Sequence, residues 1–392
     1  MNRPINVITS SQADNRRRIA SIAGENRQIY WEFSGDVLPP VSENADFATI
    51  AFLPFAMAHG RDLHVHQIVS PSLLGNLEEF QDVWCRWRGD RFRPIRIRAD
   101  EEKEPRDTGS DRTAVAAYSG GVDATYMAVQ HGAKRLGHRN RDIVAALMIH
   151  GFDIPEDADG AFEAGFRQAR GIIDEFEIPL TRVKTNWRRF SADWGMMHVV
   201  GVAAILHQYV GVADIGLLAY DYLYGREPLP WGNNSITNHL LSSRRFSLES
   251  CGGATSRTEK CAVIGRYAKV KTGLRVCWAG PMTGFNCGTC EKCVRTKLNF
   301  LAAGVGPIPA LPGTLVPTDI ERLSITGQSQ LNFFSEILDY DTVHRRLPAD
   351  LHNAVANKIA IARQETGEAP AAPRHGFWRG LKHLVGNTRA QR

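Results

Sequence analysis

The chain has 392 residues, of which 43% are hydrophobic, so it can bury a sizeable core and is expected to divide into more than one folding unit. Its formal net charge of +5 is modest for this length. Electrostatics therefore do not favour nucleic acid as a partner, and a polyanion such as ATP would suffice. Residues 1–18 contain no apolar stretch of signal-peptide length, and the apolar run 50–58 is too short to span a bilayer. We expect a cytoplasmic protein with no membrane span.

The first part of the chain, residues 1–112, is expected to form a small α+β domain followed by a charged linker. The strand-like runs are 29–33, 63–69 and 92–99, and the helical stretch is 72–87. The segment 99–112 is charged, contains Pro and Gly, and lacks apolar periodicity, which is typical of a linker. A new folding unit should begin at Thr113.

Residues 113–304 are expected to form an α/β domain, because short buried strands alternate there with helices. The strand-like runs are 113–118, 143–149, 180–183 and 214–219, and the helical runs are 160–176 and 195–210. This order predicts a parallel sheet that binds its ligand at the carboxyl ends of the strands. The last part, 305–392, is expected to be a helical extension with a basic tail. For the amphipathic piece in 371–392, a docked helix or frayed end is favoured over membrane-surface binding.

The turn after the first of these strands reads Ser-Gly-Gly-Val-Asp, residues 119–123. Two consecutive glycines allow left-handed backbone angles and let peptide N–H groups approach an anion closely. The helix expected from Ala124 adds unpaired N–H donors and the positive end of its dipole. The pattern is neither G-x-x-x-x-G-K-[ST] nor G-x-G-x-x-G, so it predicts a phosphate-binding turn unlike those of kinases or dinucleotide-binding enzymes.

In this context S-G-G-x-D resembles the PP-loop of the N-type ATP pyrophosphatases, a superfamily that includes NAD synthetase, tRNA thiolation enzymes and 7-cyano-7-deazaguanine synthase. The resemblance implies that the loop grips the β,γ-pyrophosphate of ATP and leaves the α-phosphate open to attack, with Mg²⁺ as cofactor. The family usually has Ser or Thr where this chain has Ala124. The lost hydroxyl bond could cost roughly 1.5–3 kcal/mol, and a weakened or inactive site stays open. The expected nucleotide-binding residues are Tyr118, Ser119, Gly120, Gly121, Val122, Asp123, Ala124 and His150.

Three of the seven cysteines fall within seven residues, which indicates a metal site rather than a disulfide framework. Cys277, Cys287, Cys290 and Cys293 have the spacing C-x9-C-x2-C-x2-C. Four thiolates at tetrahedral reach favour a structural Zn²⁺, with an iron–sulfur or redox cluster and free buried cysteines as the alternatives. The spacing resembles the zinc knuckle of 7-cyano-7-deazaguanine synthase, which also follows its PP-loop, and the resemblance covers about residues 113–303.

Three residues are candidates for catalysis. Arg257 and Lys260 are spaced i, i+3, which would put both cations on one helical face, where they could neutralise the pyrophosphate. A solvated surface pair is the alternative. Asp123, at the helix start, would either hold Mg²⁺ or cap backbone donors. Asn233, Asn234 and His239, after the strand at 214–219, are weaker candidates for substrate contact, with a turn-forming role as the alternative.

These features predict an enzyme that transfers AMP to a carboxylate or carbonyl oxygen, releases pyrophosphate, and lets ammonia or an amine displace AMP. The expected acceptor is a small-molecule or peptide carboxylate, and a homodimer is compatible with the sequence. Two alternatives stay open. One is tRNA or base thiolation, for which Cys251 or Cys261 would have to supply a reactive thiol. The other is a non-catalytic subunit that senses nucleotide.

Overall fold

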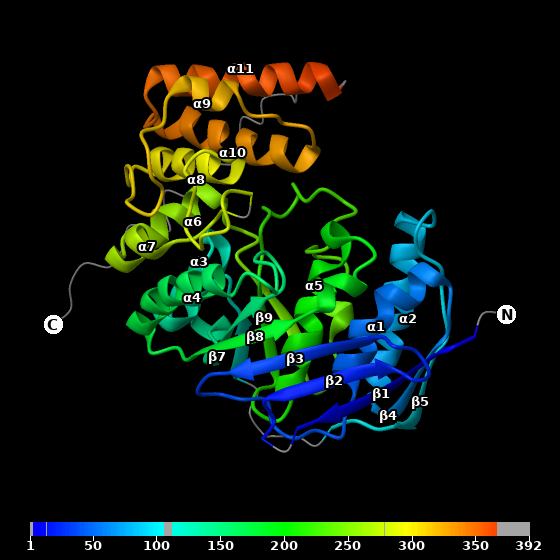
Figure 1. Cartoon of the computed structure of the whole chain (residues 1–392). Coiled ribbons are helices and arrows are strands. Elements are labelled where there is room, and N and C mark those ends of the chain that lie inside the picture. Colours follow the sequence, from blue (N-terminus) through cyan, green and yellow to red (C-terminus); the bar gives the residue numbers. More distant parts are fainter. Residues whose placement is uncertain (1–2, 13, 106–111, 278, 367–392) are drawn as a thin grey trace.

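The computed structural model describes residues 3–12, 14–105, 112–277 and 279–366. Its described strands form one sheet of ten, in the order β10-β9-β6-β7-β8-β3-β2-β1-β4-β5 (Figure 1). The strands are β1 Ile5–Ser11, β2 Arg17–Ile22, β3 Gln28–Ser34, β4 Leu63–Val69, β5 Ile97–Glu102, β6 Thr113–Ala117, β7 Asp142–His150, β8 Leu180–Thr185, β9 Ile215–Ala219 and β10 Ser247–Cys251. The helices are α1 Asp46–His59, α2 Pro71–Trp87, α3 Val122–Gly132, α4 Asp159–Ile173, α5 Trp194–Leu206, α6 Arg257–Ile264, α7 Ala268–Gly273, α8 Glu291–Ala302, α9 Pro317–Glu321, α10 Gln328–His344 and α11 Ala349–Thr366.

The sheet is mostly parallel, which confirms the predicted α/β class. Strands β8, β7, β6, β9 and β10 run parallel to one another, as the alternation of strands and helices predicted for β6 to β9. The remaining strands extend the same sheet, because β3 pairs antiparallel with β8 and places Phe33 opposite Val183. The predicted boundary at residue 112 thus separates two parts of one continuous sheet.

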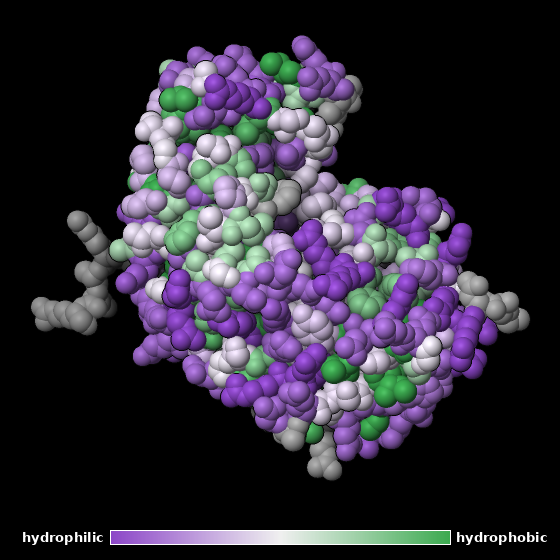
Figure 2. Space-filling model, viewed as in Figure 1, coloured by the Kyte–Doolittle hydropathy of each residue, from purple (hydrophilic) through white to green (hydrophobic). Residues whose placement is uncertain are grey.

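Alternate residues of β7 show how helices cover the parallel half on both faces. Ala145 and Leu147 belong to the core that α1 and α5 help to form, whereas Ala146 and Met148 belong to the core with α3 and α4. This alternation follows from the period of two along a strand. In the other half of the sheet the described helices cover only one face, and Figure 1 shows β2 and β3 with none of these helices in front of them. Polar residues cover most of that side (Figure 2).

The first core is shared by the two parts of the chain. Trp187, after β8, donates from Nε1 to the carbonyl oxygen of Ala51 in α1 at 2.9 Å, and both lie among fully buried aromatic and aliphatic residues. At the other end, α9, α10 and α11 stack over α8 (Figure 1). Val294 and Leu298 of α8 pack there against apolar side chains of the C-terminal helices. The predicted C-terminal extension is therefore helical up to residue 366, and its basic tail lies outside the described residues.

Two sequence-based expectations about the first 112 residues need correction. The segment 99–112 was expected to be a linker, but Ala99 to Glu102 lie in β5, where Ala99 pairs with Val65 of β4. The strand expected at 92–99 begins only at Ile97. The neighbouring strand β4 supplies hydrogen-bond partners that cannot be predicted from a charged local sequence. Pairing with β4 therefore makes this segment a strand although its composition is typical of a linker. Residues 106–111 of the expected linker lie outside the described residues.

No described helix is long and apolar enough to cross a membrane.

Candidate functional site

The turn at 119–123 joins β6 to α3 at the edge of the sheet where the parallel strands end. Gly120 has φ +73°, and a Cβ at this position would lie 3.3 Å from the Cβ of Ala169. Gly121 is the N-cap of α3, and its N–H donates to Ser119 Oγ at 3.3 Å. The first-turn N–H groups of α3 have no acceptor inside the helix. The turn therefore has the strand, the left-handed glycine and the helix start that an anion cradle needs.

The flanking residues of this turn point into the protein. Tyr118 is buried, and its hydroxyl lies 3.5 Å from Thr125 Oγ1. Val122 and Ala124 belong to the apolar core beneath α3. Ala124 faces this core, so a hydroxyl group at this position would point toward the core of the protein. Ser119 and Thr125 are the hydroxyl-bearing side chains on either side of it.

Arg257 and Lys260 meet Asp123 in the first turn of α3. Arg257 Nη2 donates to Asp123 Oδ2 at 2.6 Å, and Lys260 Nζ donates to Asp123 Oδ1 at 2.9 Å. A capping box of Ser256 and Glu259 starts α6 at this point, and the i, i+3 spacing then turns both cations the same way. The side chains of Arg257, Lys260 and Asp123 are only 9%, 1% and 18% exposed, so the pair is not a solvated surface pair.

This cluster fixes the protonation and the role of Asp123. Burial alone would raise the pKa of its carboxyl, but the charges of Arg257 and Lys260 outweigh burial and hold the pKa far below its usual range. Each carboxylate oxygen accepts from one cation, and no side chain caps the backbone donors at the start of α3. In this arrangement Asp123 orients the two cations, and the positive charges of Arg257 and Lys260 beside its oxygens oppose a Mg²⁺ ion there.

Several residues around the cluster of Asp123, Arg257 and Lys260 were not predicted from the sequence. The carbonyl oxygens of Asp221 and Tyr220, just after β9, accept from Arg257 and Lys260 respectively. The ring of Phe333 in α10 lies under the guanidinium groups of Arg257 and Arg295, at 4.2 and 4.1 Å from its centroid. Asp221 follows a predicted strand at its carboxyl end, which was a usable signal. Nothing in the local sequence marks Arg295 or Phe333.

The two asparagines considered for substrate contact build this loop instead. Asn233 Nδ2 donates to Asp221 Oδ1 at 2.8 Å and to the carbonyl oxygen of Ala219 at 2.9 Å. Asn234 Nδ2 donates to the carbonyl oxygen of Trp231 at 2.7 Å. Burial and the nearby Asp123 charge raise the pKa of Asp221. These amides therefore support a buried carboxyl group.

Near the turn, several arginine side chains have N–H groups without a hydrogen-bond partner among the described residues. The Nε atoms of Arg257 and Arg275 and Nη1 of Arg295 are buried without a hydrogen-bond partner in the part of the chain that the structure describes. Arg275 is directly attached to the turn, because its backbone N–H donates to the carbonyl oxygen of Gly120 at 3.1 Å. Buried donors without partners cost free energy. The surroundings of the turn are thus suited to an anionic ligand.

Cys277, Cys287, Cys290 and Cys293 form one compact cluster. Their sulfur atoms all lie within 4.8 Å of one another, with Sγ–Sγ distances of 3.5 Å from Cys277 to Cys287, 3.7 Å from Cys277 to Cys290 and 3.9 Å from Cys287 to Cys293. A tetrahedron with metal–sulfur bonds of about 2.3 Å has edges of about 3.8 Å. The cluster could therefore hold a metal ion such as zinc.

Backbone N–H groups and glycines surround this cluster in the way a thiolate site requires. The N–H of Cys290 points to Cys287 Sγ at 3.2 Å, and that of Gly280 points to Cys277 Sγ at 3.3 Å. A Cβ on Gly280 would lie 2.9 Å from Cys277 Sγ, so only glycine fits there. Gly288 has φ +79°, which lets the chain turn between Cys287 and Cys290. With four sulfur ligands, no coordination position is left open for chemistry.

The cysteine cluster and the turn are joined by a short chain of hydrogen bonds. Asn286 Oδ1 accepts from the N–H groups of Val276 and Cys277, at 2.8 and 3.0 Å, and its Nδ2 donates to the carbonyl oxygen of Leu274 at 2.7 Å. The intervening residue, Arg275, bonds to Gly120. The segment that carries the first metal ligand therefore supports the turn directly.

His150 lies at the carboxyl end of β7 but is packed into the protein. Its Nε2 is 2.7 Å from the carbonyl oxygen of Pro155, and its ring stacks on Phe162 with 4.4 Å between centroids. Nδ1 lies 3.7 Å from Asp159 Oδ1. Burial lowers the pKa of His150, so the imidazole is neutral at pH 7. Both ring nitrogens thus face protein groups.

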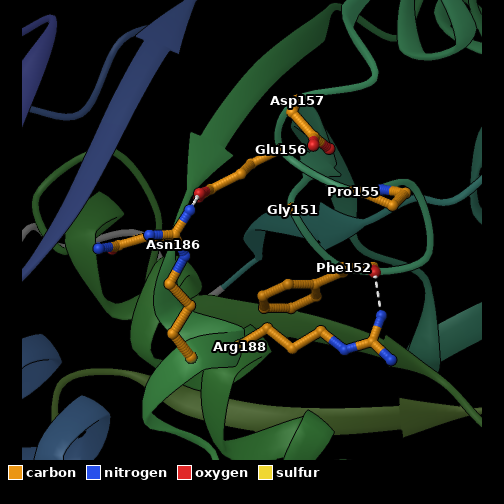
Figure 3. A pocket seen from close by; sticks show the side chains of 8 residues that line it. Gly151, Phe152, Pro155, Glu156, Asp157, Asn186 and Arg188 are labelled. Atoms are coloured by element: carbon orange, nitrogen blue, oxygen red, sulfur yellow. Dashed lines mark hydrogen bonds and ion pairs between the residues drawn. The ribbon is translucent and has the colours of Figure 1, made fainter.

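A cavity of about 300 Å³ opens on the same edge of the sheet, beyond the ends of β7 and β8 (Figure 3). Its lining residues are Gly151, Phe152, Pro155, Glu156, Asp157, Asn186, Arg188 and Arg189. Arg188 Nη1 donates to the carbonyl oxygen of Phe152 at 2.6 Å, and Arg189 pairs with Glu156. The volume is that of a small-molecule site. This cavity was not among the predicted sites, although two adjacent arginines after a predicted strand were a signal.

Comparisons with protein-family models, with curated proteins and with solved structures found no match for this chain.

Proposed function

We propose that the protein is an AMP-forming, ATP-dependent ligase of the N-type ATP pyrophosphatase superfamily, similar to 7-cyano-7-deazaguanine synthase. The observation that carries the proposal is the left-handed Gly120 turn at the start of α3, with Arg257 and Lys260 delivered to the same helical turn. The order of this turn and the four-cysteine cluster along the chain supports the same family.

In the proposed reaction, an oxygen of the acceptor carboxylate attacks the α-phosphorus of ATP. The bond from that phosphorus to the bridging oxygen breaks, and pyrophosphate leaves. Ammonia or an amine then attacks the acyl carbon, loses a proton, and displaces AMP. The N–H groups of the turn would hold the β- and γ-phosphates, while Arg257 and Lys260 stabilise the charge that leaves with pyrophosphate.

The chain offers a suitable ligand set for Zn²⁺, whereas Asp123 does not suit Mg²⁺. Cys277, Cys287, Cys290 and Cys293 would hold Zn²⁺ as a structural ion that keeps Arg275 against Gly120. Asp123 does not fit the role of a Mg²⁺ ligand, since the charges of Arg257 and Lys260 at 2.6 and 2.9 Å from its oxygens repel a second cation. We assign it instead as a positioning residue for Arg257 and Lys260.

The cavity after β7 and β8 is the proposed place for the acceptor. Its arginines, Arg188 and Arg189, suit the carboxylate of a small molecule or peptide, because guanidinium groups bind carboxylates in a planar, bidentate way. Glu156, which pairs with Arg189, would have to give up that partner to the substrate. The turn and the cavity follow neighbouring strands of the sheet, which favours one continuous site.

A nucleotide-sensing subunit without turnover is the second candidate. It is favoured by the pairing of the Asp123 carboxylate with two cations and by Ala124, where the family usually has a hydroxyl. Base thiolation is less supported. Burial raises the pKa of Cys251 to about 11, and Cys261 is fully buried, so neither supplies a thiolate at neutral pH.

The test follows the fate of the phosphates. The whole chain of 392 residues, with its metal, is incubated with ATP radiolabelled at the α-phosphate, together with mixed carboxylate acceptors and ammonium. Labelled AMP with pyrophosphate is expected, and labelled ADP with inorganic phosphate would contradict the proposal. Binding of a non-hydrolysable ATP analogue without turnover would identify the sensing subunit. Ser119→Ala and Lys260→Met should weaken binding, whereas Lys184→Met, which removes a cation paired with the exposed Asp159, should not.

A further inference from the structure

Two histidines and an aspartate converge on the uncovered face of the sheet, remote from the turn. His64 and His66 alternate along β4, so both side chains leave the same face, and Asp100 reaches them from the adjacent edge strand β5. His64 Nε2 lies 2.9 Å from Asp100 Oδ1, and His66 Nδ1 lies 3.3 Å from Asp100 Oδ2. One ligand atom from each residue lies within 4.8 Å of the others.

The contact of His66 with Asn6 indicates its tautomer. His66 Nε2 lies 3.1 Å from Asn6 Oδ1, which is an acceptor. The neutral tautomer that pairs with this oxygen carries its proton on Nε2 and a lone pair on Nδ1. That lone pair faces the carboxylate of Asp100, and two acceptors at 3.3 Å repel each other unless a cation lies between them. A metal ion between the two residues resolves this contact.

The arrangement has the features of a metal site. A ligating histidine usually donates its other N–H to an oxygen, as His66 does to Asn6. Two imidazoles with one carboxylate suit Zn²⁺ and related transition ions rather than Mg²⁺ or Ca²⁺. The side chains of His64, His66 and Asp100 are 34%, 35% and 49% exposed, so an ion would keep positions open to solvent.

We propose that His64, His66 and Asp100 form a second metal site, which binds Zn²⁺ exchangeably and is independent of the four-cysteine cluster. Arg98 lies opposite His64 in the register of β4 and β5, on the same face as Asp100, and its charge opposes a cation. The site is therefore weaker than the cysteine cluster. A bound ion would connect the edge strand β5 to β4 and tie β5 into the sheet.

The test uses the full chain after one equivalent of Zn²⁺ has filled the cysteine cluster. Titration with further Zn²⁺ in a calorimeter should then show uptake of one additional ion. His64→Ala/His66→Ala should abolish this uptake, Asp100→Asn should weaken it by about 10-fold or more, and His138→Ala, an exposed histidine elsewhere, should leave it unchanged. Arg98→Gln should strengthen it. Unchanged thermal unfolding of the zinc-loaded variants would exclude misfolding as the cause.

Two results would overturn the proposal. One is no second ion up to about 1 mM Zn²⁺, a range that covers weak sites. The other is equal uptake by the wild type and by His64→Ala/His66→Ala. Co²⁺ gives an independent readout: in the second site it should add d–d absorption without increasing the thiolate charge-transfer band. These measurements do not depend on ATP turnover, so the site and the proposed ligase activity stand or fall separately.

Discussion

Replacing Asp123 with asparagine should destabilise the protein by about 3–5 kcal/mol, the usual cost of removing one partner from a buried ion pair. The carboxylate is the shared partner of Arg257 and Lys260, at 2.6 and 2.9 Å, and these side chains are 9% and 1% exposed. Without Asp123, two buried cations lose their counter-charge. Asparagine keeps one oxygen as an acceptor, so we expect the lower part of the range.

The same residue predicts a dependence on pH. Because the folded-state pKa of Asp123 lies below its unfolded value, its contribution to stability is complete above the unfolded pKa of about 3.9 and is lost as the pH falls toward the folded pKa. The difference in free energy of unfolding between the wild type and Asp123→Asn should therefore be constant near pH 7 and shrink below about pH 4.

Urea unfolding followed by tryptophan fluorescence, at pH values from 7 to 3.5, measures both effects. Asp159→Asn is the matched control, because Asp159 also pairs with a lysine, Lys184, at 2.7 Å, but its side chain is 71% exposed. That variant should be close to the wild type, since exposed pairs contribute little. Equal stability of Asp123→Asn and Asp159→Asn would refute the buried cluster. A cost that persists unchanged at low pH would refute the assigned charge.

Cys290→Ser should release a zinc ion held by the cluster and weaken the proposed ATP binding, because the cluster holds Arg275 against the turn. Metal analysis measures the zinc content, and calorimetry measures the ATP affinity. Cys85→Ser in α2 is the control and should change neither the zinc content nor the affinity. Retained zinc would contradict the ligand set. Gly120→Ala should lower the free energy of unfolding in urea by about 1–2 kcal/mol, because Gly120 has a left-handed φ. Gly160→Ala is the control and should be neutral or stabilising, because a Cβ there meets no atom within 4 Å. Equal effects of the two substitutions would argue against a left-handed turn at Gly120. Burial lowers the pKa of His207 to about 4, so the unfolded chain takes up a proton first as the pH falls. The contribution of His207 to the free energy of unfolding is complete above about pH 6.5 and should fall by roughly 3 kcal/mol by pH 4. Urea unfolding measured at several pH values should show this dependence in the wild type and not in His207→Gln. The same pH dependence of the free energy of unfolding in both proteins would contradict the prediction.

The parallel half of the sheet was predictable because its strands are apolar on both sides. Alternation of such runs with helical patterns identified β6 to β9 and the helices between them. Strands β1, β2 and β10 were missed, since at most one side of each is buried and sequences such as Ser247–Cys251 are largely polar. Helix α1 was also missed. Its apolar run contains Pro54, which argues against a helix locally, yet burial in the shared core stabilises it.

For the candidate site, the sequence placed Arg257 and Lys260 on one face of a helix and Asp123 at the start of another. It could not show that these residues meet, because 134 residues separate Arg257 from Asp123 along the chain. The cysteine cluster was easier, since three of its ligands are local. The H-x-H pattern of β4 was readable as two histidines on one face, but Asp100 joins them only through strand pairing.

The pairing of β3 with β8 limits how this chain can be divided for experiments. Strand β8 borders β7 on one side and β3 on the other, so its backbone groups are satisfied only when the first part of the chain is present. A fragment starting at Thr113 would carry an open, partly apolar strand edge, which recruits strands from other copies. We expect such a fragment to self-associate, and the protein that is assayed for ATP chemistry must therefore keep its first hundred residues.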